Sequence, residues 1–260
     1  MKTLYLIDIS SFIFRAYYAI KSLNTKDGLP VNAVYGVVSM MHRLIESHKP
    51  DHLVVCRDVG GKGFRHEIYP AYKANRSAPP EDLVPQFDLI KEFVETVPFH
   101  TVQKPGFEAD DVIASLVKKF KDQDHTKIYI VSSDKDLMQL VCKNVVLYDP
   151  MKDKELGEKE VIEKFGVPPS QVIDVQSLCG DPSDNIKGVA GIGPKTAAKL
   201  ITEYKTLENL LASAEKISGK VGENLRAHVD DALLSKKLVT LVDDLKLGLE
   251  WDSLAFAEPN

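Results

Sequence analysis

Residues 4–8 read LYLID, a short apolar run that ends directly at an aspartate. Further short runs follow at Leu53–Cys56, His100–Val102, Lys127–Val131 and Val145–Tyr148. Between them, apolar residues recur with helical spacing at Val31–Ser47, Leu83–Val94 and Val112–Phe120. Short strands that alternate with longer helices are typical of an α/β fold. We therefore predict a mainly parallel sheet flanked by helices in the first two-thirds of the chain.

The chain changes character near Pro168. From there to about Leu247 the pattern is helical with short connections, and no further strand is predicted. We expect an α/β unit over residues 1–165 and an all-helical unit over about 166–257. Two connecting segments stand out: residues 57–82 are loop-rich and basic with interleaved aromatic residues, and residues 185–200 form a glycine-rich turn that leads into a helix.

Acidic residues gather in five clusters, most of them where a predicted strand ends or a helix begins. They are Asp8, Asp58, the trio Glu108, Asp110 and Asp111, the pair Asp134 and Asp136, and the pair Asp181 and Asp184. Unpaired buried charge is unfavourable, whereas a hard divalent cation such as Mg²⁺ is bound through oxygen ligands. In an open parallel sheet, ligands bind beyond the carboxyl ends of the strands. Metal-assisted phosphate chemistry is therefore the leading hypothesis.

Each cluster also has a purely structural interpretation. Asp8 and Asp58 could be turn formers or helix N-caps, and acids at a helix start are favoured by the helix dipole. Capping explains one of Asp134 and Asp136 but not both, and residues 180–185 read as a turn. Because acidic clusters recur five times at strand ends or helix starts, we favour a functional role over a purely structural one. Two metal ions about 3.5–4 Å apart can hold and hydrolyse a phosphodiester, and nine carboxylates suit the ligand demand of such a site.

Charge, hydropathy and cysteine spacing limit the possible partners, location and metal sites of the protein. The net charge is −5, but the nine clustered acids account for −9, so the remaining chain carries +4 and a nucleic-acid partner is not excluded. No stretch approaches the roughly 20 apolar residues of a membrane span, and Asp8 interrupts what would be a signal peptide. We therefore expect a cytoplasmic protein. The three cysteines have no zinc-binding spacing and are expected in the core.

Several stretches together resemble the 5′-nuclease (flap endonuclease) family, in particular its bacterial branch. They are LIDISSFIFRAYYAI (6–20), YGVVSMMHRLI (35–45), FRHEIYPAYKANR (64–76), GFEADDVIASL (106–116), SSDKDLMQLV (132–141) and LCGDPSDNIKGVAGIGPKTAAKLI (178–201). That branch comprises the 5′→3′ exonuclease domain of DNA polymerase I and its free-standing relatives. The resemblance implies a PIN-like α/β nuclease that uses two Mg²⁺ ions, with Mn²⁺ as a substitute, to cut 5′-flap DNA near the junction of single and double strand.

The resemblance also assigns roles to the acids and to the basic segment. Asp8, Asp58, Glu108 and Asp110 match the family's ligands for the tighter metal, and Asp111, Asp134, Asp136, Asp181 and Asp184 match the acids around the looser one. Residues 57–82 match the arch through which a 5′ single strand is threaded. Lys73 and Arg76 fall on its catalytic basic positions, and Arg65 is a further DNA contact. Tyr72 and Tyr17 are candidates for stacking on unpaired bases, although core packing explains Tyr17 equally well.

Residues 185–203 resemble the family's helix–hairpin–helix, which grips duplex DNA and often binds K⁺. Gly188, Gly191 and Gly193 would let backbone N–H groups approach a phosphate at the start of the next helix, and Lys195 and Lys199 would add charge there. A dinucleotide-binding interpretation fails, because no strand precedes the turn. The resemblance leaves open whether the chain is a free-standing monomer or a part of a polymerase.

Arg57 departs from the family pattern, which has an apolar residue before the aspartate at position 58. Its side chain could point out past the strand end, contact a phosphate or tilt Asp58. Alternatives to the flap nuclease are a non-catalytic branched-DNA binding module, a PIN-type ribonuclease and an α/β phosphatase. Intact acidic clusters argue against the first, and the helical unit and basic segment against the other two.

Overall fold

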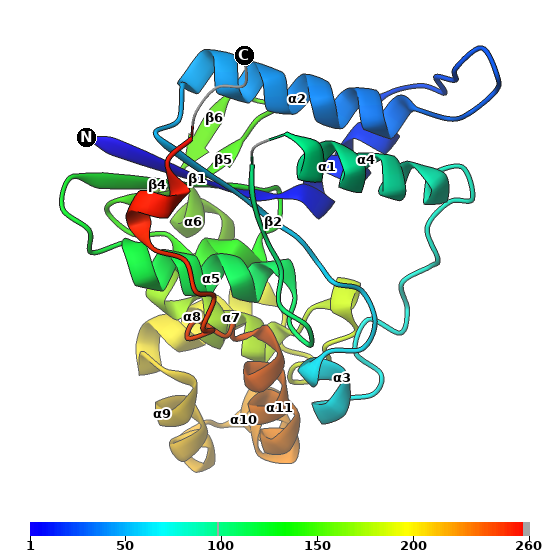
Figure 1. Ribbon diagram of the computed structural model, residues 1–260. Helices are drawn as coiled ribbons and strands as arrows, with labels where there is room; N and C mark the ends of the chain where they lie inside the picture. The colour runs from blue at the N-terminus through cyan, green and yellow to red at the C-terminus, as the bar shows by residue number, and fades with distance from the viewer. Residues whose placement is uncertain (98, 257–260) are drawn as a thin grey trace.

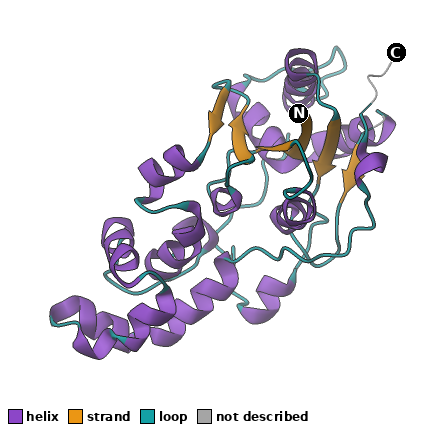
Figure 2. Cartoon of the chain, turned by 90° about the vertical axis from the view of Figure 1, so that its left-hand side faces the viewer, coloured by secondary structure: helices purple, strands orange, loops and turns teal. Residues whose placement is uncertain are grey.

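A six-stranded sheet forms the centre of the protein in this computed structural model, which describes residues 1–97 and 99–256. The strand order is β3-β2-β1-β4-β5-β6, and all neighbours are parallel except β5 and β6. The strands are β1 (Lys2–Asp8), β2 (His52–Cys56), β3 (His100–Val102), β4 (Thr126–Val131), β5 (Val145–Asp149) and β6 (Lys154–Leu156). Figure 2 shows them with helices on both faces. The predicted α/β class with a mainly parallel sheet is confirmed.

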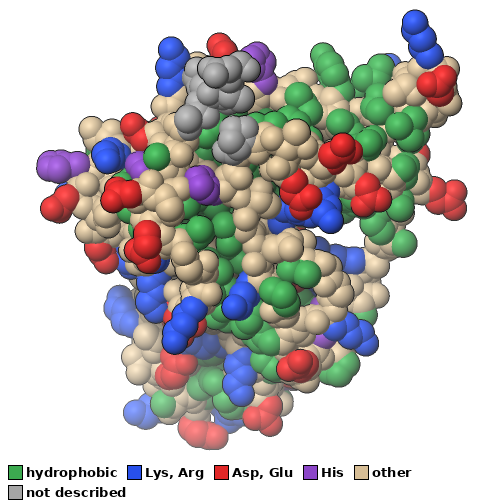
Figure 3. Space-filling model, in the orientation of Figure 1, with side chains coloured by type: hydrophobic (Ala, Val, Ile, Leu, Met, Phe, Trp, Pro, Cys, Tyr) green, Lys and Arg blue, Asp and Glu red, His purple; other side chains and the backbone are tan. Residues whose placement is uncertain are grey.

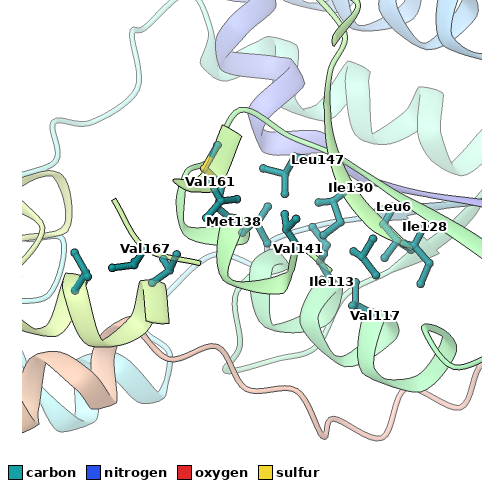
Figure 4. Close-up of a cluster of buried hydrophobic side chains, with 14 of the residues drawn as sticks. Leu6, Ile113, Val117, Ile128, Ile130, Met138, Val141, Leu147, Val161 and Val167 are labelled. Carbon is teal, nitrogen blue, oxygen red and sulfur yellow. The ribbon is translucent and has the colours of Figure 1, made fainter. Parts of the chain in front are cut away.

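β1 lies in the middle of the sheet because its side chains are apolar on both faces. Leu4 and Leu6 pack in a core with α5 (Ala109–Phe120), whereas Tyr5 and Ile7 face a second core with helices α1 (Ile9–Ala19), α2 (Asn32–His48) and α4 (Val84–Thr96). Figure 4 shows the first core, where Leu6, Ile128 and Ile130 of the strands meet Ile113 and Val117 of α5. Burial on both faces is what a parallel sheet requires.

The five predicted strands are all present, with ends within two residues of the prediction. β6 was not predicted, because the sequence KEL at residues 154–156 is charged and lies half-exposed or exposed at the sheet edge. Helix α5 begins at Ala109 rather than Val112, so the predicted acidic trio forms its cap and first turn. Within the basic segment, a short helix α3 (Phe64–Ile68) breaks the expected loop.

The last third of the chain is helical as far as Val239. Its helices are α6 (Glu158–Phe165), α7 (Val172–Cys179), α8 (Pro194–Tyr204), α9 (Leu207–Ala212), α10 (Gly219–Ala227) and α11 (Val229–Val239). The expectation of helix to about Leu247 is wrong. Residues 240–256, here called the return segment, leave α11 without helical structure until a 3₁₀ turn at Trp251–Leu254 and run back to the sheet. In Figure 1 this segment is drawn in red and crosses α5.

Backbone groups of the return segment bond to other parts of the protein, and these bonds replace those of a helix. Val242 N–H donates to Asp111 of α5, and Leu245 N–H donates to the Ser115 hydroxyl. Near its end, Phe256 N–H donates to the carbonyl of Asp51. Trp251, the chain's single tryptophan, lies buried against His52 and Phe120. Residue 257, the predicted end of the helical unit, lies outside the described residues.

No helix among the described residues has both the length and the apolar character that a membrane crossing demands.

We predict that Trp251→Ala lowers the free energy of unfolding by about 3 kcal/mol, because it removes a buried ring that joins the return segment to the sheet. Denaturant unfolding followed by circular dichroism measures this. Tyr35→Ala is the control, since the Tyr35 ring is 59% exposed on α2 and its removal should cost less than about 1 kcal/mol. Equal decreases in the two variants would show that the return segment adds little to stability.

Candidate active site

Acidic side chains from separate segments meet in one cavity at the carboxyl edge of the sheet. β1 ends in Asp8, Asp58 and Asp134 follow β2 and β4, and the start of α5 supplies Glu108 and Asp110. The cavity measures about 520 Å³ and is also lined by Lys73, Arg76, Lys135, Lys164, Phe14 and serines at positions 10, 11, 133 and 183. Five of the nine predicted acids therefore line a common space.

Asp8 and Asp58 are held by short contacts that orient their carboxylates. Asp8 caps α1 by accepting from Ser11 N–H at 3.1 Å, and its other oxygen accepts from Ser132 Oγ at 2.8 Å. Asp58 accepts from Ser10 Oγ at 2.6 Å and from Ala109 N–H at 2.8 Å. The capping interpretation of Asp8 is thus correct, and the same cap aims its carboxylate into the cavity. Burial, together with Asp58 and Asp134, raises the pKa of Asp8 to about 6 despite its two hydrogen bonds.

Asp110 is the least compensated carboxylate of the cavity. Within residues 1–97 and 99–256, its side chain accepts no hydrogen bond and forms no ion pair. Burial raises its pKa well above the ordinary value, and repulsion from Asp134, Asp8 and Asp58 adds to the shift. Such a group is stabilised by a proton or by a cation from outside the chain.

The structure does not bring the other four predicted acids to the cavity wall. Asp136 accepts from Gln176 Nε2 at 2.6 Å, and burial and Asp134 raise its pKa to about 7. Asp181 pairs with Lys135 at 2.7 Å. Asp184 is buried and pairs with Arg76 and, at 3.7 Å, with Lys73.

Asp111 is the acid whose predicted role fits least. It is fully buried, lies outside the cavity and forms a two-pronged ion pair with Arg65 at 2.7 and 2.8 Å. Asp111 is therefore not placed to bind a metal in the cavity. Arg65 is 2% exposed and is not available to a phosphate, so its predicted DNA contact is corrected as well.

Cations of the basic segment lie directly over the acids. Lys73, whose backbone has φ of +54°, donates to Glu108, and Arg76 donates to Asp184. Burial lowers the pKa of Lys73, but Glu108 and Asp184 outweigh this and raise it overall. Figure 3 shows a face hollowed between the two halves of the molecule, with Lys and Arg side chains at the opening.

The prediction that Tyr72 stacks on a base needs correction, whereas Tyr17 fits the core-packing alternative, since it packs against the second core. Tyr72 is 4% exposed, and its hydroxyl lies 3.0 Å from Glu108 and 3.1 Å from Asp184, so its ring is not open to a base. Tyr17 is half-buried and donates to Asp82 at 2.7 Å. The exposed rings on α1 are instead Phe14 and Tyr18, four residues apart and therefore on one helix face. That spacing was visible in the sequence and was missed.

Lys135 and Lys164 were also missed, although both line the cavity. Lys135 stands between two predicted acids, and Lys164 lies in the last turn of α6. Nothing in the local pattern around Lys164 indicates that α6 turns this residue toward the sheet edge.

The glycine-rich turn joins α7 to α8. Gly188 is buried, and an added Cβ would lie 2.4 Å from the backbone nitrogen of Gly180, so this glycine serves close packing rather than DNA contact. Gly191 and Gly193 are exposed, and Gly193 caps α8. Lys195 and Lys199 are exposed on the first two turns of α8. This part of the predicted DNA-binding surface is open to solvent.

Arg57 does not line the cavity. Its guanidinium is 2.9 Å from Glu95 of α4, and its backbone N–H donates to the carbonyl of Val102.

No group of three or more His, Cys, Asp or Glu side chains in the described part of the chain has the geometry of a preformed metal site. The arrangement has a physical cause, since the acids repel one another and several are drawn toward Lys73, Arg76 and Lys135.

Comparison with known proteins identifies relatives along the whole chain. A family model described as the N-terminal resolvase-like domain of 5′-3′ exonuclease matches residues 3–166, and the C-terminal SAM fold of 5′-3′ exonuclease matches residues 167–260. DNA polymerase I of Rhizobium leguminosarum is 47% identical over 99% of the chain and 26% of its own length. A 5′-3′ exonuclease of Aquifex aeolicus is 42% identical over 100% of the chain and 89% of its own length.

Solved structures agree with these matches. The T5 5′-exonuclease with bound zinc ions has a TM-score of 0.78 and 27% identity. A bacteriophage T5 flap endonuclease variant in complex with DNA and metal ions has a TM-score of 0.78 and 25% identity. Each alignment covers 93% of the chain and 90% of the T5 protein. The chain spans about a quarter of the length of the DNA polymerase I that it matches.

We predict that the protein without metal becomes less stable as pH rises from about 4 to about 7. The pKa values of Asp8 and Asp136 are raised from 3.8 to about 6 and about 7. Between the ordinary and raised values the folded protein binds more protons than the unfolded chain, so the free energy of unfolding falls with pH. Thermal unfolding in EDTA at pH 5.5 and pH 8 should show a lower Tm at pH 8.

Asp136→Asn should raise the Tm at pH 8 and shrink the difference between the two pH values. Asp149→Asn is the control, because Asp149 is also buried at a strand end but Arg15 holds its pKa low despite burial. That variant should lower the Tm at both pH values alike. A Tm of the parent protein that rises with pH would contradict the raised pKa values of Asp8 and Asp136.

Proposed function

The chain belongs to the 5′-3′ exonuclease family, a family of DNA nucleases, and from this we propose that it is a metal-dependent, structure-specific nuclease. Its proposed substrate is branched DNA with a 5′ flap, cut near the junction of single and double strand, with 5′→3′ exonuclease action. The observation that carries the proposal is the meeting of five carboxylates from four separate segments in one cavity, which Lys73 and Arg76 also line. A cytoplasmic location follows from the proposed DNA substrate and is part of the proposal.

The donor set of the cavity suits divalent metal ions. Asp8, Asp58, Glu108, Asp110 and Asp134 present carboxylate oxygens, the ligands that Mg²⁺ and Mn²⁺ prefer. Asp110 lacks a compensating partner in the described structure; burial and repulsion from Asp134 raise its pKa, and a bound cation would offset both effects. When bound, two divalent ions would activate water and neutralise charge on the phosphate. Asp136, Asp181 and Asp184 lie further out, where they could act on a second ion through water.

Lys73 and Arg76 are proposed to bind the scissile phosphate. Both line the cavity opposite the acids, and both are now paired with carboxylates, Lys73 with Glu108 and Arg76 with Asp184. Lys73 would give up its bond to Glu108 once that carboxylate holds a metal ion, and the half-exposed Arg76 can exchange Asp184 for a phosphate. The cations could then stabilise the charge that develops on the phosphate. The ion pairs therefore hold the basic groups at the site until substrate and metal arrive.

The alternative functions account for less of the molecule. A binding module has no need of crowded acids whose pKa values are raised by burial and mutual repulsion. A phosphatase has no use for a basic segment of residues 57–82 or for the exposed Lys195 and Lys199. The PIN-type ribonuclease shares the sheet, but the family matches extend through the helical unit to residue 260. The predicted K⁺ at the turn, the monomeric state and the link to a polymerase remain predictions.

The first test is cleavage of a 5′-labelled flap DNA with Mg²⁺ by the parent protein and by an Asp134→Ala/Asp136→Ala variant. We expect cutting near the junction that falls by at least about 10³-fold in the variant, since removal of metal ligands abolishes the activated water. The matched control is Asp122→Ala/Asp124→Ala, an exposed acid pair with the same spacing ahead of the same strand. Tight flap binding without cleavage by the parent protein would instead favour the binding module.

A second test addresses duplex binding. Lys195→Ala/Lys199→Ala should weaken binding to duplex DNA and reduce the slope of log affinity against log salt by about 2, one for each phosphate that the variant no longer neutralises. The matched control is Lys2→Ala/Lys49→Ala, two exposed lysines close to the amino-terminal ends of β1 and β2. Fluorescence anisotropy over a salt series measures both. An unchanged slope in the first variant would remove α8 from the DNA-binding surface.

A further inference from the structure

Arg65 and Asp111 form a buried ion pair where three parts of the protein meet. Arg65 lies on α3 in the basic segment, Asp111 lies in the first turn of α5, and the return segment passes beside both. Arg65 is 2% exposed and Asp111 is fully buried. The guanidinium and carboxylate are joined by two parallel hydrogen bonds, the geometry in which an arginine is held most rigidly.

Every strong donor around Asp111 is already used to hold structure. Its two oxygens accept from Arg65, from Val242 N–H at 2.9 Å and from Glu108 N–H at 3.1 Å. Arg65 in turn donates to the carbonyls of Leu238 at 2.8 Å and Thr240 at 3.2 Å. A metal bound to Asp111 would have to displace these donors and leave Arg65 buried without its partner, which is strongly unfavourable.

The pair fixes the acids of α5 relative to the cations of the basic segment. Asp111 directly follows Asp110 and closes the helix cap with Glu108, so it determines how the start of α5 is presented to the cavity. Arg65 anchors α3, and the chain then runs on to Lys73 and Arg76. The two parallel hydrogen bonds between Arg65 and Asp111, here called the fork, therefore join the acids of α5 to the basic segment. Arg65 also bonds to the carbonyls of Leu238 and Thr240, which ties the end of α11 to the same pair.

We propose that Arg65 and Asp111 are positioning residues for catalysis and that Asp111 is not a metal ligand, an inference that rests on the nuclease function proposed above. Removal of the fork would let the carboxylates and the phosphate-binding cations shift relative to each other. Displacement of catalytic groups by about 1 Å lowers turnover by about 10²-fold. The metal ligands themselves would keep their oxygens, so the affinity for Mg²⁺ would change little.

The test compares Asp111→Asn, Arg65→Gln and the double variant in cleavage of a flap DNA over a Mg²⁺ series. Each single change should lower kcat by about 10- to 100-fold, and the double variant should be no slower than the slower single one, because both remove the same fork. The Mg²⁺ concentration for half-maximal rate should stay within about twofold of the parent value. Arg65→Lys, which keeps the charge but not the fork, should recover only part of the rate.

Two further variants serve as controls. Asp110→Asn should raise the Mg²⁺ requirement at least about tenfold, as expected of a ligand. Asp243→Asn breaks the exposed ion pair between Lys118 of α5 and the return segment, 2.8 Å long, and should leave kcat unchanged. Assays run well below the Tm of every variant, and a variant that does not fold is replaced by Arg65→Lys.

An Asp111→Asn variant that raises the Mg²⁺ requirement as Asp110→Asn does would make Asp111 a ligand and overturn the proposal. The proposal would also be overturned if both single variants kept the parent kcat but had a lower Tm, because the pair would then contribute to stability alone. If the parent protein does not cut DNA, the nuclease proposal itself fails. In that case the Tm values of the four proteins in the double-mutant cycle still report whether Arg65 and Asp111 are coupled.

Discussion

Repulsion between carboxylates gathered at one edge of a parallel sheet is the constraint on which the rest of this structure depends. A parallel sheet brings the carboxyl ends of its strands to the same edge, so the Asp8, Asp58 and Asp134 side chains are forced together by the fold itself. Burial, together with repulsion from neighbouring carboxylates, raises the pKa values of Asp8, Asp110 and Asp136, so the charged acids are unfavourable to stability. A fold selected for stability alone would have no reason to keep these acids in place.

The surrounding structure limits that repulsion with short, specific contacts. Ser11 and Ser132 donate to Asp8, Ser10 donates to Asp58, and Gln176 donates to Asp136. Lys73, Arg76 and Lys135 reach in from the basic segment and from the loop after β4. None of these cations is as deeply buried as Arg65. The compensation therefore has two parts: hydrogen bonds from neighbouring serine, glutamine and backbone groups, and ion pairs with cations that are more exposed than Arg65.

Much of this could be predicted from the sequence, because apolar runs that end in an acid carry both the sheet and the site. The five parallel strands, and the acids at the ends of β1, β2 and β4, follow from that pattern. β6 and the return segment do not, because KEL has too few apolar residues to read as a strand, and residues 241–247 read as helix. The return segment is held by side chains of α5 that are distant in the sequence, Asp111 and Ser115. Such long-range hydrogen bonds produce no hydrophobic periodicity in residues 240–256, so the sequence does not predict them.

Asp110 and Asp111 are adjacent acids of one sequence motif, but helix geometry gives their side chains different surroundings. Adjacent residues on a helix point about 100° apart, so Asp110 and Asp111 present their carboxylates in different directions. Asp110 faces the other carboxylates, whereas Asp111 lies on the face that also carries Ser115, four residues later. Ser115 is buried and binds the return segment, as Asp111 does. The spacing of Asp111 and Ser115 thus marks a structural face of α5, and the acid on that face needs a buried arginine rather than a metal ion.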